Sequence, residues 1–490
     1  MKLPSLLKIF TLSIFALATI QSNAQDDFTT DSSSSDKEYY SKGLKLFQKR
    51  ECLDAISFFN KAISINPKYG EAYLARAYAK EYLGDFYGAI SDLEKCIDFS
   101  PNKGDLRDAY SSRAGIKRKQ GDLEGALSDY TKCIEINPRD WVIYSQRAGI
   151  KESQGDYEGA LSDYTKCIEI NPRDWVIYSQ RAGIKRKQGD LEGALLDYTK
   201  CIEINPRDWV TYSQRAGIKE SQGDLGGSLS DYTKCIEINP SDWVTYSQRA
   251  GIKRKQGDLE GALSDYTKCI EINTRDWVTY SQRAGIKRKQ GDLEGALSDY
   301  TKCIEINPSD WVTYSQRAGI KESQGDLEGS LLDYTKCIEI NPRDWITYSQ
   351  RAGIKRKQGD LEGALSDYTK CIEINPSDWV TYSQRAGIKE SQGDLEGSLS
   401  DYTKCIEINP SDWATYSQRA GIKRKQGDLG GSLSDYTKCI EINPSDGVNL
   451  KSRGLLKIEM GQLESGCLDL ARVGEMGISV AYDLIKEHCN

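Results

Sequence analysis

The chain has 490 residues, a formal net charge of −7, 28% charged residues and a single histidine, His488. The sequence contains no Gly-rich phosphate-binding loop and no His-Glu metal motif, and no Ser, Cys or carboxylate set stands apart from its repeated pattern. We therefore expect no enzyme activity, no bound metal and no cofactor. The acidic balance also argues against general binding to nucleic acid.

Residues 1–24 carry the pattern of a secretory signal peptide. Two lysines precede an apolar run from Ile9 to Ile20, and a small-x-small motif ends at Ala24, which predicts cleavage before Gln25. The apolar run has about half the length that a bilayer requires, and no later segment is apolar enough to span a membrane. We expect an exported protein in the periplasm, the cell envelope or the extracellular medium.

A 34-residue repeat organises the rest of the chain, and a fixed period of this size indicates stacked helical units. The predicted segments follow in this order: a flexible polar linker, 25–35; units one and two, 36–102; ten near-identical units, three to twelve, 107–446; a degenerate unit thirteen, 447–477; and a C-terminal capping helix, 478–490. Three extra residues near Lys103-Gly104-Asp105 are expected to lengthen the connection before unit three.

Each unit predicts two helices. In unit four, Asp140 can cap a first helix that starts at Trp141 and stops at Gly155, where glycine tolerates the left-handed conformation. Asp156 can cap the second helix, which Pro172 ends because proline neither donates a backbone hydrogen bond nor continues a helix.

This helix–turn–helix pattern resembles the tetratricopeptide repeat. Unit one matches the family framework through Tyr39, Gly43, Leu46, Ala55, Phe59, Ala62 and Pro67. The near-identical units keep Ala148, Ala160, Tyr164 and Pro172, but place Arg147 and Lys151 where the family has leucine and tyrosine. The resemblance covers about nine-tenths of the chain. It implies an all-α, right-handed superhelical α-solenoid of about thirteen units, whose first helices line a concave groove.

Ten cysteines recur at 34-residue intervals: Cys133, Cys167, Cys201, Cys235, Cys269, Cys303, Cys337, Cys371, Cys405 and Cys439. Packed helices lie roughly 8–10 Å apart, whereas a disulfide needs Cα atoms within about 7 Å. Disulfides between successive units are therefore not expected. We interpret these cysteines as small buried apolar residues.

Arginine and aspartate are placed symmetrically about the turn of each hairpin except that of unit one, which has Lys42 and Phe58 at these positions. Arg147 lies eight residues before Gly155 and Asp163 eight residues after it, so the two side chains should face each other. The same spacing relates Arg76 to Asp92 and Arg453 to Asp469 in diverged units. We predict internal, structural ion pairs; a functional role is the alternative.

Tryptophans open units four to twelve: Trp141, Trp175, Trp209, Trp243, Trp277, Trp311, Trp345, Trp379 and Trp413. Such a ladder can pack against the preceding connection, which is the more frequent role of a residue at a helix start. Alternatively, its rings can stack on sugars or peptides.

The end of the first helix alternates in charge between units. Most units carry Arg-Lys there and the others Glu-Ser; the candidate rim residues are Arg118, Lys119, Glu152, Arg186, Lys187, Arg254 and Lys255. These charges can contact a partner, or complement the helix dipole and form weak surface pairs. Ser145, Gln146 and Gly149 are the candidate groove positions, and they lack the Lys and Asn set with which some family members bind a terminal carboxylate.

Two further cysteines lie outside the 34-residue pattern. The second helix of unit thirteen and the capping helix should form a hairpin that turns at Gly477-Ile478. Cys467 lies eleven residues before Ile478 and Cys489 eleven after it, so we predict a disulfide between them.

The resemblance implies a non-catalytic scaffold that binds protein or peptide in its groove, with no role for nucleic acid. A glycan-binding surface built on the tryptophans and a purely structural spacer remain as alternatives. The sequence identifies neither the partner nor the oligomeric state.

Overall fold

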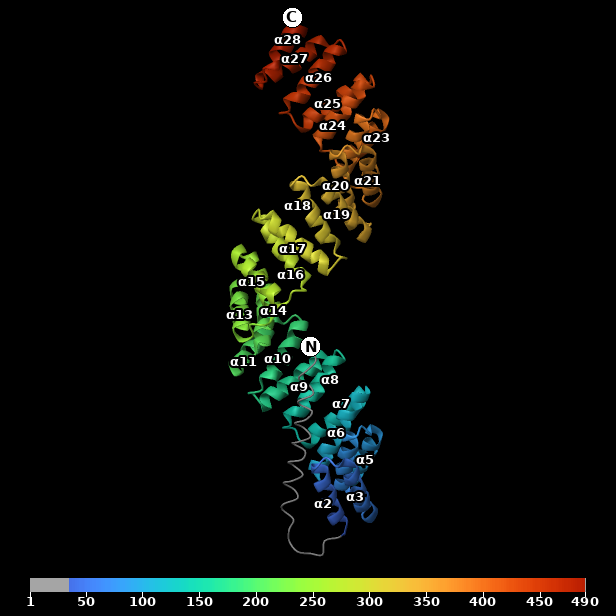
Figure 1. Cartoon of the computed structure of the whole chain (residues 1–490), viewed down its shortest axis with the longest axis vertical. Coiled ribbons are helices and arrows are strands. Elements are labelled where there is room, and N and C mark those ends of the chain that lie inside the picture. Colours follow the sequence, from blue (N-terminus) through green and yellow to red (C-terminus); the bar gives the residue numbers. More distant parts are fainter. Residues whose placement is uncertain (1–34, 490) are drawn as a thin grey trace. The chain divides into compact units, whose positions relative to one another are not determined.

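The computed structural model describes residues 35–489, and these form helical hairpins in sequence order (Figure 1). The predicted signal peptide and all of the predicted linker except Ser35 lie outside these residues. The described residues divide into two compact bodies, one up to Ile252 and one from Lys253 onward, at a point within α14.

The first helices of units one to thirteen are α2 (Ser35–Gln48), α4 (Gly70–Tyr82), α6 (Lys103–Gln120), α8 (Trp141–Ser153), α10 (Trp175–Lys187), α12 (Trp209–Ser221), α14 (Trp243–Lys255), α16 (Trp277–Lys289), α18 (Trp311–Ser323), α20 (Trp345–Lys357), α22 (Trp379–Ser391), α24 (Trp413–Lys425) and α26 (Gly447–Glu459). The second helices are α3 (Cys52–Ile65), α5 (Phe86–Phe99), α7 (Leu123–Ile136), α9 (Tyr157–Ile170), α11 (Leu191–Ile204), α13 (Leu225–Ile238), α15 (Leu259–Ile272), α17 (Leu293–Ile306), α19 (Leu327–Ile340), α21 (Leu361–Ile374), α23 (Leu395–Ile408), α25 (Leu429–Ile442) and α27 (Leu463–Glu475); α28 (Val480–His488) follows them. This arrangement confirms the predicted all-α solenoid class.

The caps of unit four follow the sequence prediction. The Asp140 carboxylate accepts hydrogen bonds from the first backbone amides of α8, and Asp156 accepts one from Gly159 at the start of α9. Between the two helices Gly155 has φ +83°, a left-handed conformation that costs other residues steric strain. Local chemistry therefore sets where each hairpin turns.

Packing between neighbouring units supplies the core. Ala148, Ala160, Tyr164 and Cys167 of unit four form one buried cluster with Ile177 and Ile184 of unit five. Because each unit completes the core of the unit beside it, the apolar face of the last hairpin needs a cover. Helix α28 supplies this cover through Ala481, which is fully buried in a cluster with Ile440, Leu450 and Val473.

One predicted connection is wrong. Lys103-Gly104-Asp105 do not lengthen a loop before unit three, because they form the first turn of α6. Asn102 caps this turn through its side-chain oxygen, which accepts a hydrogen bond from the Gly104 amide at 2.8 Å. The extra residues therefore extend a helix by almost one turn.

Candidate functional site

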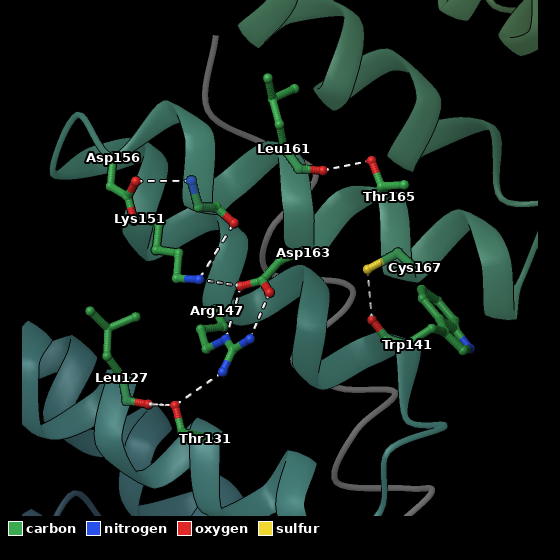
Figure 2. A network of polar contacts seen from close by, with 11 residues as sticks. Leu127, Thr131, Trp141, Arg147, Lys151, Asp156, Leu161, Asp163, Thr165 and Cys167 are labelled. Carbon is green, nitrogen blue, oxygen red and sulfur yellow. Dashed lines mark hydrogen bonds and ion pairs between the residues drawn. The ribbon is translucent and has the colours of Figure 1, made fainter.

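A largely buried ion-pair network joins the two helices of the hairpin in unit four (Figure 2). Arg147 Nε and Nη2 donate to the two Asp163 oxygens at 2.8 and 2.6 Å, and Lys151 Nζ lies 3.0 Å from the same carboxylate. Arg147 Nη1 also donates to Thr131 Oγ1 of unit three at 3.1 Å. The network satisfies its own donors and acceptors, which makes it a structural connection between α7, α8 and α9.

The diverged units two and thirteen keep the same pair, as the hairpin spacing predicts. Arg76 Nε donates to Asp92 at 2.8 Å, and Arg453 Nε donates to Asp469 at 2.8 Å. Burial by itself would raise the pKa of Asp469, but hydrogen bonds from Arg453 and Lys457 outweigh it and lower that pKa.

The periodic cysteines are buried thiols, and several of them donate hydrogen bonds to backbone carbonyls. Cys167 Sγ donates to the Trp141 carbonyl at 3.1 Å (Figure 2), and burial raises the pKa of Cys133 to about 12. Thiols with such pKa values hold their protons near neutral pH and are poor nucleophiles or metal ligands. Among residues 35–489, no cluster of His, Cys, Asp and Glu has the arrangement of a metal site.

A capping contact that the sequence analysis missed links several units. Thr211 Oγ1 donates to the N-cap carboxylate of Asp208, and Cys201 Sγ of the preceding unit lies 3.1 Å from the same hydroxyl. Equivalent threonine–cysteine contacts recur in later units. The spacing of aspartate three residues before threonine at a helix start is the sequence signal for this contact.

The tryptophans are partly buried, as the packing alternative expects. Trp277 packs against Ile270, Tyr280 and Cys303, and Trp345 packs in the same way in unit ten. Trp413 is the one exception among the nine, with 38% of its surface exposed. Packing of this kind buries part of each of these side chains and leaves part of it exposed.

The predicted groove residues lie on the first-helix face, defined here by Ser145, Gln146, Gly149 and their equivalents in units three to twelve. Gly149 is exposed, and Ser145 and Gln146 are half-buried. Gln146 Oε1 accepts hydrogen bonds from Arg118 of the preceding unit at 3.1 Å and from Tyr130 at 3.2 Å. The structure therefore brings a groove residue and a rim residue together.

The rim residues form salt bridges between neighbouring first helices. Lys119 pairs with Glu81 at 3.0 Å, and Lys187 pairs with Glu152 at 2.8 Å. Arg186 donates to Gln214 at 2.7 Å. Arg254 and Lys255 are exposed near the end of α14. Much of the charge alternation therefore serves pairing between units, which was one of the two interpretations of the sequence.

One acidic side chain sits in an unusual environment at the start of α6. The Asp105 carboxylate is half-buried and accepts a hydrogen bond from Ser100 Oγ at 3.0 Å. Burial raises its pKa to about 6; the Ser100 hydrogen bond opposes this increase, and the charges of Glu71 and Asp108 add to it. This group titrates within the accessible pH range and provides a test of the fold.

No helix within residues 35–489 combines the length and the apolar composition that crossing a bilayer requires.

A family model described as tetratricopeptide repeat matches eight segments: 70–103, 108–140, 143–174, 177–208, 245–276, 279–310, 347–378 and 381–412. Together these segments cover more than half of the chain.

Curated relatives and solved structures match parts of the chain. Tetratricopeptide repeat protein 36 of Danio rerio is 34% identical over 89 residues, which are 17% of this chain and 48% of that protein. An uncharacterized protein of Methanocaldococcus jannaschii is 40% identical over 48 residues, 10% of this chain and 56% of that protein. The chain thus spans about half the length of the curated relatives it matches.

Two solved structures give low overall similarity. YrrB, described as a TPR protein with an unusual peptide-binding site, has a TM-score of 0.35 and 20% identity, over 38% of this chain and 97% of that one. A tetratricopeptide repeat protein from Parabacteroides merdae has a TM-score of 0.36 and 20% identity, over 51% of this chain and 98% of that one. With family matches along both bodies and the hairpins observed in each, the chain belongs to the tetratricopeptide repeat family.

Proposed function

We propose that the chain is a non-catalytic scaffold that binds a protein or peptide partner on its first-helix face. The family membership supports an interaction scaffold. The observation that carries the proposal is a set of ten glycines in the middle of the first helices: Gly115, Gly149, Gly183, Gly217, Gly251, Gly285, Gly319, Gly353, Gly387 and Gly421.

Glycine inside a helix is about 0.5–1 kcal/mol less favourable than alanine. A turn or a crowded backbone can require glycine, but neither is present here. A Cβ atom built on Gly149 meets nothing within 4 Å, and at Gly217 it meets only the Tyr232 hydroxyl, 4.0 Å away. The fold alone therefore gives no reason for glycine at this position.

The end units fill the same position with large side chains. Leu44 in unit one and Tyr78 in unit two pack against buried clusters, and unit thirteen has Leu455. The ten inner units instead leave the helix backbone accessible at this point. Close approach of another backbone is a general reason to keep glycine on a surface, and a bound peptide supplies such a backbone.

The test is selection of binders from a displayed random-peptide library on the mature chain. A variant with Gly149→Gln, Gly183→Gln and Gly217→Gln fills the first-helix face of three consecutive units. The matched control is Ser128→Gln, Ser162→Gln and Ser230→Gln, at exposed sites on the second helices. We expect the glycine variant to bind selected peptides at least about tenfold more weakly, which is 1.4 kcal/mol, and to melt no earlier than the parent.

Two results would overturn the proposal: unchanged binding in the glycine variant, or equal losses in both variants. Quenching of tryptophan fluorescence by cell-wall sugars, without any selected peptide, would instead support the glycan-binding alternative. An array that binds neither class of ligand would be a structural spacer.

We further propose that the scaffold works after export. The support is the sequence pattern of residues 1–24. Mass spectrometry of protein from the cell envelope or medium should find Gln25 at the N-terminus. Recovery of intact Met1 in that fraction would refute the export proposal and leave the binding proposal unaffected.

A further inference from the structure

Salt bridges between first helices follow a simple rule. The lysine that ends the first helix of one unit pairs with the glutamate 35 residues earlier, in the unit before it. Lys187–Glu152 measures 2.8 Å, and Lys357–Glu322 and Lys425–Glu390 each measure 2.7 Å. The rule works because Arg-Lys units usually follow Glu-Ser units.

The arginine of the same units contacts the unit that follows. Arg186 donates to Gln214, Arg288 to Gln316 and Arg356 to Gln384, each at 2.7 Å. In an Arg-Lys unit that lies between two Glu-Ser units, the lysine therefore contacts the preceding unit and the arginine contacts the following one. Its two cations are neutralised or held by neighbouring side chains.

Units seven and eight break this rule, because both carry Arg-Lys. Arg254 stands 35 residues before Lys289, at the position that Glu152 occupies relative to Lys187. Two exposed cations thus occupy the pair of positions at which other neighbouring units place a cation and an anion. This pair of positions on units seven and eight is called the Arg254–Lys289 step below. Within residues 35–489, the structure shows no hydrogen bond or ion pair for Arg254 or Lys289.

Arg254 and Lys289 lie at the rim of the first-helix face. Burial raises the pKa of Tyr266, and the nearby Arg254 guanidinium opposes that increase. Tyr266 occupies the position of Tyr130, whose hydroxyl reaches the groove residue Gln146. The uncompensated charge therefore lies beside the face that we propose for partner binding.

We propose that the Arg254–Lys289 step binds an acidic segment of the partner peptide, through carboxylate or phosphate groups. This inference rests on the proposed function and assigns a chemical class to part of its ligand. An anion placed between two like charges gains attraction from both and relieves their mutual repulsion. A short acidic peptide segment fits better than a nucleic acid, because a single local pair of cations can hold only a few negative charges, while the rest of a chain of net charge −7 repels an extended polyanion.

The chain supplies its own matched variants. Arg254→Glu with Lys255→Ser converts unit seven to the Glu-Ser form that units four, six, nine and eleven already use, so the substitution suits the shared backbone. Arg356→Glu with Lys357→Ser makes the same conversion in unit ten. Each double substitution changes the net charge equally, and only the first places an acid opposite Lys289.

The probe is a fluorescein-labelled octaglutamate peptide, with octaglutamine and the single-stranded dT8 as comparisons, in about 20 mM salt, where screening is weak. The parent chain is expected to bind octaglutamate and not octaglutamine. The unit-seven variant is expected to bind it at least about tenfold more weakly, and the unit-ten variant within about twofold of the parent.

Three results would overturn the inference: no octaglutamate binding by the parent, equal losses in both variants, or tighter binding of dT8 than of octaglutamate. The library-selected peptides separate this failure from failure of the scaffold. If they still bind in a glycine-dependent way while octaglutamate does not, the acidic-ligand inference is wrong and the scaffold proposal stands. If no peptide binds at all, the scaffold proposal fails as well.

Discussion

Three buried serines should destabilise the units that contain them. Ser228, Ser330 and Ser398 are fully buried on the second helices, and their hydroxyl oxygens have no hydrogen-bond partner within residues 35–489. Sibling units have alanine at this position, as at Ala160 and Ala194, and these side chains are equally buried. The shared backbone thus already accommodates alanine, and Ser→Ala removes one oxygen atom without opening a larger cavity.

The expected gain follows from two contributions. Burial of an unpaired hydroxyl costs about 1–3 kcal/mol, and alanine favours helix over serine by about 0.5 kcal/mol. Each of the three substitutions should therefore stabilise its unit by about 1–3 kcal/mol. Ser432 is the matched control, because its hydroxyl donates to the Ala420 carbonyl at 2.8 Å. Ser432→Ala loses that bond, worth about 1 kcal/mol, and should be nearly neutral.

Hydrogen exchange is the appropriate assay, because long repeat arrays need not unfold in a single step. Mass spectrometry of peptides from units six, nine and eleven would report the local opening free energy in the full chain. A denaturant melt of the triple variant would give the cumulative effect. Slower exchange in the three variants and no change in Ser432→Ala would support the reasoning. Faster exchange in Ser228→Ala, or the same gain in all four variants, would refute it.

Three other predictions test separate parts of the fold. The pKa of Asp105 is raised to about 6 in the folded chain, so its contribution to stability is complete below about pH 4 and is lost as the pH rises to about 6. Asp105→Asn should flatten this dependence in chemical melts, and an unchanged slope would contradict it. Cys467 and Cys489 are joined by a disulfide, whereas the twelve other cysteines are buried and form no disulfide. Thiol titration of denatured, non-reduced protein should therefore count twelve groups, and fourteen would exclude the bridge. Reduction should cost roughly 3 kcal/mol at the C-terminal cap. Thr274→Pro should stabilise by about 0.4–1 kcal/mol, because every other unit from one to twelve has proline at this position. A lower melting midpoint would show that this connection needs threonine.

Sequence spacing predicted the contacts that depend on hairpin symmetry. Arg147 and Asp163 lie at equal distances from Gly155, and Cys467 and Cys489 lie at equal distances from Ile478. In an antiparallel hairpin such positions face each other whatever the surrounding sequence. The structure contains both the ion pair and the disulfide.

Sequence spacing did not predict contacts that depend on local capping or on side-chain reach between units. The Asn102 side chain accepts a hydrogen bond from the Gly104 amide, and α6 therefore begins earlier than the repeat pattern predicts. This one side-chain hydrogen bond decides whether the residues form helix or loop. The contact from Arg118 to Gln146 needs the offset between successive first helices, and a repeat period does not provide it. The unpaired position of Arg254 depends on the 35-residue pairing between first helices, which the repeat period does not specify.

Some features recur in diverged and near-identical units alike, whereas others recur only in the near-identical units. This difference distinguishes residues that stabilise the fold from residues that serve a function. The Arg–Asp pair appears in diverged units as well as in near-identical ones, as Arg76–Asp92 and Arg453–Asp469 show. Because the pair persists in units two and thirteen, it stabilises the hairpins that carry it; unit one, which has Lys42 and Phe58 at these positions, forms its hairpin without it. The first-helix glycine behaves differently: it is confined to units three to twelve, and unit two has Tyr78 in its place. The hairpin folds with either residue, so the hairpin itself does not require glycine at this position. A partner that binds close to the helix backbone on the first-helix face would require it.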